Sequence, residues 1–234
     1  MHADFRSNKI ISLLPKEIVE EWMPHFEEVN LKFGQVLYEP GSALGHLYFP
    51  LTAIVFGVHT LENGASTKIA TTGREGVVGI YLLMGAAKTH NQAIVHKAGT
   101  AIRLRLSVLL HHFNHGSAVQ KIFLRYAQTL FIQMSQNSVC HKHHSLEQQL
   151  SRMFLQTLDR QDGDAIALTH EAMADMLGVR REAVSQAAHR LMNANVITYS
   201  RGHITVLNRA DLETRTCECY KVISEEYRNF IATV

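Results

Sequence analysis

A short segment near the C-terminal end of the chain concentrates side chains whose hydrogen-bonding groups match nucleic-acid bases. Its sequence is Arg180-Arg181-Glu182-Ala183-Val184-Ser185-Gln186. A guanidinium can fork onto guanine O6 and N7, a carboxylate can accept from the cytosine amino group, and an amide can pair with adenine N6 and N7. We therefore expect Arg181, Glu182 and Gln186 to contact base edges.

A second group of polar side chains in the same region is suited to phosphate oxygens, which position a protein without conveying sequence. The members of this group are Thr169, Arg180, Ser185, Arg190 and Arg201. The same residue types also occur on a solvated helix face that binds nothing. The elements that carry these side chains decide between the two interpretations.

Residues 168–193 predict two short helices joined by a tight turn. Thr169 is a good N-cap for the first helix, and Gly178 ends it. The three-residue turn Gly-Val-Arg is followed by a second helix, residues 181–193, whose inner side holds Val184, Ala188 and Leu191. This arrangement is a helix-turn-helix, in which the start of the second helix enters the DNA major groove.

A hairpin is predicted directly after the second helix. Residues 196–199 and 204–206 alternate like two strands, with Gly202 in the tip between them. The hairpin is the wing of a winged helix-turn-helix. A merely structural helix pair would not need this addition, so the wing favours DNA binding.

The net charge of the chain gives little indication of such a partner. The formal charge is +2, and residues 145–234 carry 10 basic and 12 acidic side chains. Within residues 180–193, however, three arginines oppose one glutamate. We expect modest nonspecific affinity and, if His189 or His203 faces phosphate, stronger DNA binding at mildly acidic pH.

The N-terminal half has a different character. Short apolar runs separated by turn residues extend from about Asn30 to Leu106, and Asn63-Gly64 between two such runs is a strong hairpin signal. These features predict a small antiparallel barrel or sandwich, so the chain as a whole is expected to be α+β. We expect this domain to end at residue 115.

A long helix is predicted next, over residues 117–139, within a segment 116–144 that connects the two halves. Its apolar stripe comprises Phe123, Tyr126, Leu130, Met134 and Val139. Packing against a second copy would bury this stripe, and so would packing against the chain's own barrel.

The C-terminal domain is expected to span residues 145–234. Ser145 and Gln148 have the spacing of a capping box at the start of another helix. From Asn208, apolar groups through Phe230 predict one terminal amphipathic helix.

In the order of these elements, the chain resembles the Crp/Fnr family of bacterial transcription regulators. The family's recognition helix opens Arg-Glu-x-Val-x-Arg, which here is Arg181-Glu182-Ala183-Val184-Ser185-Gln186. The resemblance implies a cyclic-nucleotide-binding-like β-roll, a dimerisation helix and a winged helix-turn-helix. It also implies a homodimer on near-palindromic double-stranded DNA, with RNA polymerase as a further partner. Because Gln186 replaces the last arginine, we expect a different operator.

The sensor half departs from the family's nucleotide-binding members. Ile80 occupies the place of their phosphate-binding Glu, and no Arg lies between Arg74 and Arg103. The cyclic phosphate therefore lacks its charge-assisted contact, and we expect no physiological binding of cyclic AMP. The residues left for a pocket, for an effector of unknown identity, are Gly76, Gly79, His90 and Asn91. Structural turns are the more common use of such glycines.

The cysteines and histidines could form a metal site, or they could be structural side chains that bind nothing. Three cysteines are too few for the four ligands of an iron–sulfur cluster, although Cys140, His143 and His144 have a spacing that would place three ligands on one helix face. On a helix, Cys217 and Cys219 would point about 200° apart, which favours buried structural thiols. We expect no metal and no cofactor.

Other function classes have less support. The sequence contains no nucleophile elbow, phosphate loop or His-Glu-x-x-His spacing, so we do not expect an enzyme. A signalling module whose winged helix contacts protein remains an alternative, and so does a regulator that senses haem or a metal. The first ten residues lack a secretory apolar region, and no apolar run approaches the roughly 18 residues of a membrane span. These observations predict a cytoplasmic protein with no membrane partner.

Overall fold

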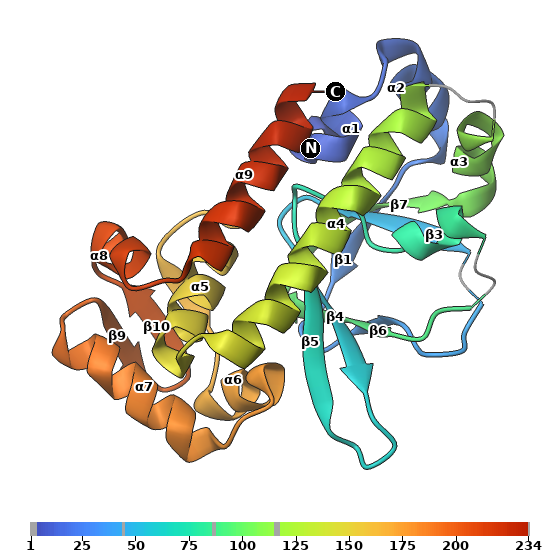
Figure 1. Cartoon of the computed structure of the whole chain (residues 1–234). Coiled ribbons are helices and arrows are strands. Elements are labelled where there is room, and N and C mark those ends of the chain that lie inside the picture. Colours follow the sequence, from blue (N-terminus) through green and yellow to red (C-terminus); the bar gives the residue numbers. More distant parts are fainter. Residues whose placement is uncertain (1–3, 44, 86–87, 115–117, 234) are drawn as a thin grey trace. The chain divides into compact units, whose positions relative to one another are not determined.

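The computed structural model describes residues 4–43, 45–85, 88–114 and 118–233 (Figure 1). These residues form two compact units, described here one at a time. The first lies within Met1–His59, Ala70–Phe131 and Glu226–Val234, and the second within Thr60–Ile69 and Ile132–Glu225. The expected domain boundary at 115/116 lies outside the described residues.

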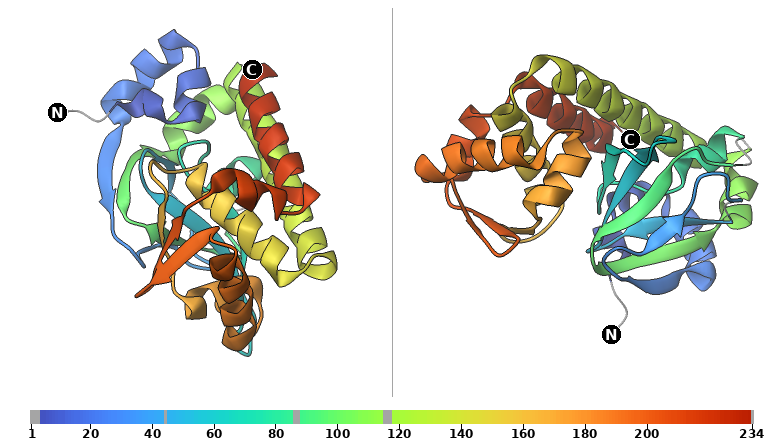
Figure 2. Two further views of the ribbon diagram at one scale, coloured as in Figure 1. Left: turned by 90° about the vertical axis from the view of Figure 1, so that its left-hand side faces the viewer. Right: turned by 90° about the horizontal axis from the view of Figure 1, so that it is seen from below.

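The first unit is built on two antiparallel sheets. One has the order β1-β7-β3 and the other the order β2-β6-β4-β5. Their strands are β1 (Glu27–Leu31), β2 (Val36–Tyr38), β3 (His46–Pro50), β4 (Ile54–Thr60), β5 (Ser66–Thr72), β6 (Gln92–Lys97) and β7 (Gly99–Arg105). Figure 2 shows from two further sides that these strands surround a common interior. The expected β-roll of an α+β protein is confirmed.

Local sequence explains the strand order. The expected hairpin joins β4 to β5, and Gly64 in its loop has a φ of +83°. A left-handed conformation of this kind costs glycine nothing, whereas a side chain would strain it. The interior is filled from alternate positions of several strands, including Leu31, Val55, Val95 and Ala101.

Short helices cover the ends of this roll. They are η1 (Phe5–Ser7), α1 (Lys9–Leu13), α2 (Lys16–Trp22), η2 (Met23–His25), η3 (Ile80–Met84) and α3 (Leu106–Phe113). Asn8 fastens the N-terminal helices to the sheets, since its side-chain amide donates 2.9 Å bonds to the carbonyl oxygens of Pro50 and Gly76.

The long helix α4 (Ala118–His143) continues four residues beyond its expected end. Phe123, Tyr126 and Leu130 are buried, and within the first unit Phe123 packs edge-on against Phe49 at 6.3 Å between ring centroids. This part of the predicted stripe therefore packs against the chain's own roll.

Farther along α4, Met134 of the predicted stripe is half-buried, but the prediction for Val139 is wrong. Val139 is exposed, while the polar side chains of Gln133 and Asn137 are buried. Asn137 fits because its amide donates a 2.9 Å bond to the carbonyl oxygen of Ile69 and its oxygen accepts from Arg152. A fixed polar network thus replaces the apolar contacts expected there.

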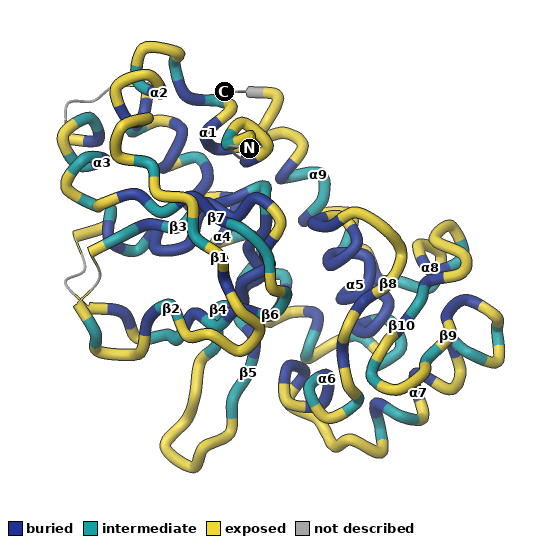
Figure 3. The backbone as a smooth tube through the Cα atoms, turned by 180° about the vertical axis from the view of Figure 1, so that it is seen from behind, coloured by how far each residue is buried: buried dark blue, intermediate teal, exposed yellow. Residues whose placement is uncertain are grey.

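The second unit surrounds α5 (Leu146–Leu158), whose residues 149–158 are all buried and appear dark in Figure 3. The predicted capping box of Ser145 and Gln148 is present. The remaining elements are β8 (Ala165–Ala167), α6 (His170–Leu177), α7 (Arg181–Asn193), β9 (Ile197–Ser200), β10 (His203–Val206), α8 (Arg209–Thr214) and α9 (Glu218–Thr233).

The expected single terminal helix is wrong, because two helices, α8 and α9, cover this region. Residues 215–217 separate them. Leu212 and Ile223 are both buried, so the apolar positions were identified correctly although the chain bends between them. The bend places Cys217 before the first residue of α9.

Candidate nucleic-acid interface

The helices α6 and α7 form the predicted helix-turn-helix. The Thr169 hydroxyl caps α6 by accepting a 3.1 Å bond from the backbone N–H of Ala172. Gly178 ends the helix with a φ of +64°, which turns the chain within three residues into the start of α7 at Arg181. The turn residues therefore fix the angle between the helices locally.

One side of α7 is buried, which leaves the opposite side of the helix exposed to solvent. Val184, Ala187, Ala188 and Leu191 are buried, and α7 packs against both α5 and α6. The three residues expected on the inner side are all among them. A helix packed against two others on one side presents its remaining side as a rigid surface.

The predicted base-contacting side chains lie on that surface. Arg181, Glu182 and Gln186 are exposed, as is His189 one turn farther on. Arg181 Nε lies 3.7 Å from a carboxylate oxygen of Glu171 on α6, and both side chains are more than 60% exposed. An exposed pair of this length is weak, so Arg181 remains available to a ligand.

The residues predicted to contact phosphate differ in what they already bind. Arg180 and Arg201 are exposed, and Thr169 is exposed while serving as the helix cap. Arg190 Nε donates a 2.9 Å bond to Glu147 of α5. Arg190 therefore carries a packing role that its sequence position does not indicate.

Ser185 belongs to a small polar network that the sequence did not indicate. Its hydroxyl lies 2.9 Å from Nδ1 of His170, and the His170 ring stacks on Tyr199 at 4.1 Å between centroids. Burial lowers the pKa of His170, and the charges of Arg181 and His189 lower it further. A neutral His170 thus links α6, α7 and the wing strand β9.

The wing is a hairpin with a two-residue tip. Ser200 pairs with His203, and both Arg201 and Gly202 have positive φ, at 48° and 81°. Two such residues form a type I′ turn, for which arginine is an unusual choice. A Cβ on Gly202 would lie 3.2 Å from Thr169, so the tip lies beside the start of α6.

The two glycines of the predicted effector pocket have structural roles in the first unit. A Cβ on Gly76 would lie 2.2 Å from the Tyr126 hydroxyl, and that hydroxyl donates a 3.3 Å bond to the Val77 carbonyl. Gly79 has a φ of +102° and caps η3. Burial raises the pKa of Tyr126 well above its usual value, so the phenol stays neutral.

The other two pocket residues, His90 and Asn91, do not line the cavity beside Gly79. His90 is exposed, and Oδ1 of Asn91 accepts a 3.0 Å bond from Nδ1 of His59. The cavity that Gly79 lines has a volume of only about 20 Å³, enough for one water molecule. A larger depression of about 490 Å³ runs along residues 36–48 and contains none of the four.

The cysteines differ from the expected arrangement. All three are buried, as expected, but Cys217 and Cys219 converge on Cys140 because Cys217 precedes α9. His144 joins them, whereas His143 is exposed. The Cys140 and Cys217 thiols share a hydrogen bond with 3.5 Å between the sulfurs, and this bond, with the backbone N–H of Cys219, lowers the pKa of Cys217.

Comparison with known proteins agrees with this architecture. Residues 148–215 match the model of the Crp-like helix-turn-helix domain. FixK2 from Bradyrhizobium japonicum superposes with a TM-score of 0.68 at 17% identity, over 82% of this chain and 98% of that one. Residues 148–215 therefore form a Crp-like helix-turn-helix domain, and the described residues share the fold of Crp/Fnr-type structures. The resemblance stated from the sequence is therefore confirmed for the helix-turn-helix and for the fold.

Two further Crp/Fnr-type folds are similar at low identity. A crp/fnr regulator from Eubacterium rectale has a TM-score of 0.69 at 15% identity, over 86% of this chain and 94% of that one. The c-di-GMP-responsive regulator CLP from Xanthomonas campestris has 0.64 at 12%, over 83% and 100%. No protein of curated function matches by sequence. Among the described helices, none combines the length and hydrophobicity that a membrane span requires.

Proposed function

We propose that this Crp/Fnr-type regulator acts in the cytoplasm as a homodimer that binds a near-palindromic DNA site through α7. The observation that carries the proposal is the exposed side of α7, on which Arg181, Glu182 and Gln186 lie while α5 and α6 hold the opposite side. A rigid helix with hydrogen-bonding heads near its N-terminus fits the major groove.

Arg181, Glu182 and Gln186 are assigned to bases, and Thr169, Arg180, Ser185, Arg190 and Arg201 to phosphates. The wing supports this division, because its tip lies beside Thr169 and brings Arg201 to the start of α6. Ser185 and Arg190 would each exchange a present partner for phosphate. Binding through them is therefore expected to add less affinity than their charge or hydroxyl group alone suggests.

Dimerisation is assigned to the exposed apolar side chains of α4, of which only Val139 belongs to the predicted stripe. Leu124 and Phe131 are seven residues apart and 52% and 56% exposed, and Val139, eight residues after Phe131, is 47% exposed. Apolar residues at heptad spacing on one helix pack against a second helix. A second copy of the chain is the proposed occupant, and RNA polymerase remains a predicted further partner.

Cyclic AMP is not the proposed effector. Ile80 is buried in place of a phosphate-binding carboxylate, and the cavity beside Gly79 holds about 20 Å³. A cyclic nucleotide would need several hundred cubic ångströms and a cation for its phosphate. Calorimetry should detect no micromolar binding, and a measured micromolar constant would reject this part of the proposal.

A gel shift on fragments selected from genomic DNA tests the proposal as a whole. Affinity should fall steeply as salt rises, because phosphate contacts release counterions. Arg181→Ala should relax sequence preference, whereas Arg190→Ala should weaken binding to all sequences alike. Arg215→Ala is the matched control for the second variant, because Arg215 also binds Glu147 but does not lie on α7.

Two results would count against the proposal. Binding that does not change with salt would favour the alternative in which the winged helix contacts protein. An equal loss on all sequences for both Arg181→Ala and Arg190→Ala would remove Arg181 from the base-contacting group.

A further inference from the structure

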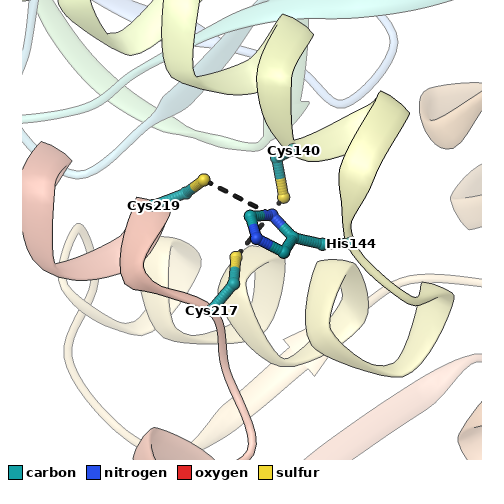
Figure 4. A group of neighbouring side chains, drawn as sticks. All are labelled: Cys140, His144, Cys217 and Cys219. Carbon is teal, nitrogen blue, oxygen red and sulfur yellow. Dashed lines mark hydrogen bonds between the residues drawn. The ribbon is translucent and has the colours of Figure 1, made fainter.

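Four side chains that could bind a metal converge within the second unit. Cys140 lies in the last turn of α4, His144 follows that helix, and Cys217 and Cys219 flank the first residue of α9 (Figure 4). Their sulfur and nitrogen atoms all lie within 4.8 Å of one another. No other group of at least three potential metal ligands occurs in the described parts of the chain.

Two of the separations between these atoms match the edges of a tetrahedral zinc site. The Cys140 and Cys217 sulfurs are 3.5 Å apart, and the Cys219 sulfur lies 3.6 Å from Nδ1 of His144. Zinc bonds of about 2.3 Å to sulfur and about 2.0 Å to nitrogen give tetrahedral edges of about 3.5 to 3.8 Å. A disulfide would need about 2.05 Å between sulfurs, and a cluster with a separate iron for each thiolate would need larger separations.

The ligand types select the metal. Three thiolates and one imidazole form one of the usual structural zinc sets, whereas calcium and magnesium require oxygen ligands. The cysteines are between 0% and 4% exposed, and all four coordination positions are filled by protein atoms. A closed four-ligand site of this kind is structural, because a catalytic zinc keeps one position open.

The surroundings supply both the orientation and the charge that such a site requires. The second ring nitrogen of His144 lies 3.2 Å from a carboxylate oxygen of Glu218, which leaves Nδ1 directed at the sulfurs. Carboxylates commonly orient zinc-bound histidines in this way. The buried guanidinium of Arg152 acts electrostatically on Cys140 and Cys219, and its positive charge offsets the excess of three thiolates over a dication.

We propose that Cys140, His144, Cys217 and Cys219 bind one zinc ion, which fastens the end of α4 to the start of α9. This inference is independent of the proposed DNA contacts, since none of the four residues belongs to α6, α7 or the wing. Because the ligands come from segments about 75 residues apart in sequence, the ion would join the two ends of the second unit.

The first test uses the unmodified full chain. Protein purified under reducing conditions without chelator is measured by native mass spectrometry and by elemental analysis. We expect about one zinc per chain, and after chelation we expect zinc or cobalt to rebind at about the same stoichiometry. The cobalt form should show the intense d–d absorption of tetrahedral coordination and a thiolate-to-cobalt charge-transfer band.

Variants then assign the ligands. Cys217→Ser should lower the zinc content to less than a tenth of the wild-type value, whereas His143→Ala, an exposed neighbour of the site, should leave it unchanged. Glu218→Gln should retain zinc with an affinity about 10-fold to 100-fold lower, because it alters only the orientation of His144.

Several results would overturn the proposal. One is the absence of stoichiometric zinc from the purified wild-type chain, together with a failure of the chelated chain to bind zinc or cobalt. A Cys140–Cys217 disulfide in protein kept under reducing conditions is another. Octahedral cobalt spectra, or iron with inorganic sulfide at the site, would equally reject a tetrahedral zinc centre.

Discussion

The residue-scale chemistry of the proposed DNA interface includes one strained position. Arg201 has a left-handed backbone at the wing tip, where glycine or asparagine is the usual choice. An arginine there costs about 1–2 kcal/mol. Strain retained at an exposed tip suggests that the guanidinium itself is needed, in agreement with the proposed phosphate contact.

The variant Arg201→Asn distinguishes the backbone strain at the wing tip from the charge of the guanidinium. Asparagine adopts the left-handed conformation readily, so the free energy of unfolding should stay the same or rise by up to about 1 kcal/mol. The DNA affinity should fall several-fold, and the slope of log affinity against log salt should fall by about one. Thermal unfolding and salt-dependent gel shifts measure the two effects.

The control for this variant is Lys221→Asn, which removes an exposed cation from α9. It should leave the DNA affinity unchanged. Unaltered DNA binding by Arg201→Asn would show that the wing tip does not contact phosphate.

Gly76 offers a second prediction at this scale. Its missing side chain makes room for the Tyr126 hydroxyl, so Gly76→Ala should lower the free energy of unfolding by about 1–3 kcal/mol through overpacking. Gly45→Ala is the matched control, because nothing lies within 4 Å of its added carbon and its φ is not positive. Urea denaturation compares them, and equal stability of the two variants would contradict the close contact.

At the scale of elements, local sequence signals were sufficient to predict most of the helix-turn-helix. Thr169, Gly178 and the capping box of Ser145 all act on neighbouring backbone groups, so their effects are contained in short stretches of sequence. The hairpin at Asn63-Gly64 was predictable for the same reason. Turn chemistry depends little on the rest of the fold.

Contacts between distant segments were not predictable. Helical periodicity identified apolar positions on α4, but it could not show that Asn137 is bound to Ile69 and Arg152, or that Val139 is exposed. The convergence of Cys217 on Cys140 likewise depends on the bend between α8 and α9. Which partner buries a side chain is decided by tertiary structure.

The exposed apolar side chains of α4 lead to a prediction about the proposed dimer. The double variant Leu124→Glu/Phe131→Glu should convert the proposed dimer to monomer, because it places charges on an apolar contact. DNA affinity should fall with it, since two half-sites would no longer be bound together. Sedimentation velocity measures the oligomeric state.

A volume-conserving double variant, Leu124→Met/Phe131→Leu, controls for effects on the helix itself and should remain dimeric. A dimer that persists in the double-glutamate variant would place the contact on another surface.

At the scale of the whole molecule, the buried amine of Lys68 makes stability depend on pH. Lys68 is only 8% exposed, and burial, with the charges of Arg152 and Arg160, lowers its pKa from 10.5 to about 7. At pH values between about 7 and 10.5, the Lys68 amine is protonated in the unfolded chain and neutral in the folded chain. Stability attributable to Lys68 therefore rises with pH from about 7 to 10.5 and is lost as pH falls toward 7.

Lys68→Met tests this linkage. At pH 7 the variant should be more stable than the wild type by about 1–4 kcal/mol, because an apolar group replaces a buried cation. The difference in the free energy of unfolding between the variant and the wild type should shrink as the pH rises toward 10. Denaturation curves across this range provide the comparison, and a difference that does not vary with pH would show that Lys68 keeps an ordinary pKa.

The tyrosine that fills the interior beside Gly76 also makes the first unit suitable for chemical control. Tyr126→Ala would remove a phenol-shaped volume bounded by Gly76, Val77 and Phe230, while leaving the Val77 carbonyl as a hydrogen-bond acceptor. Enclosed apolar cavities of this kind bind small aromatic molecules. Added phenol should then restore the stability that the substitution removes, which would provide a regulator responsive to a synthetic inducer.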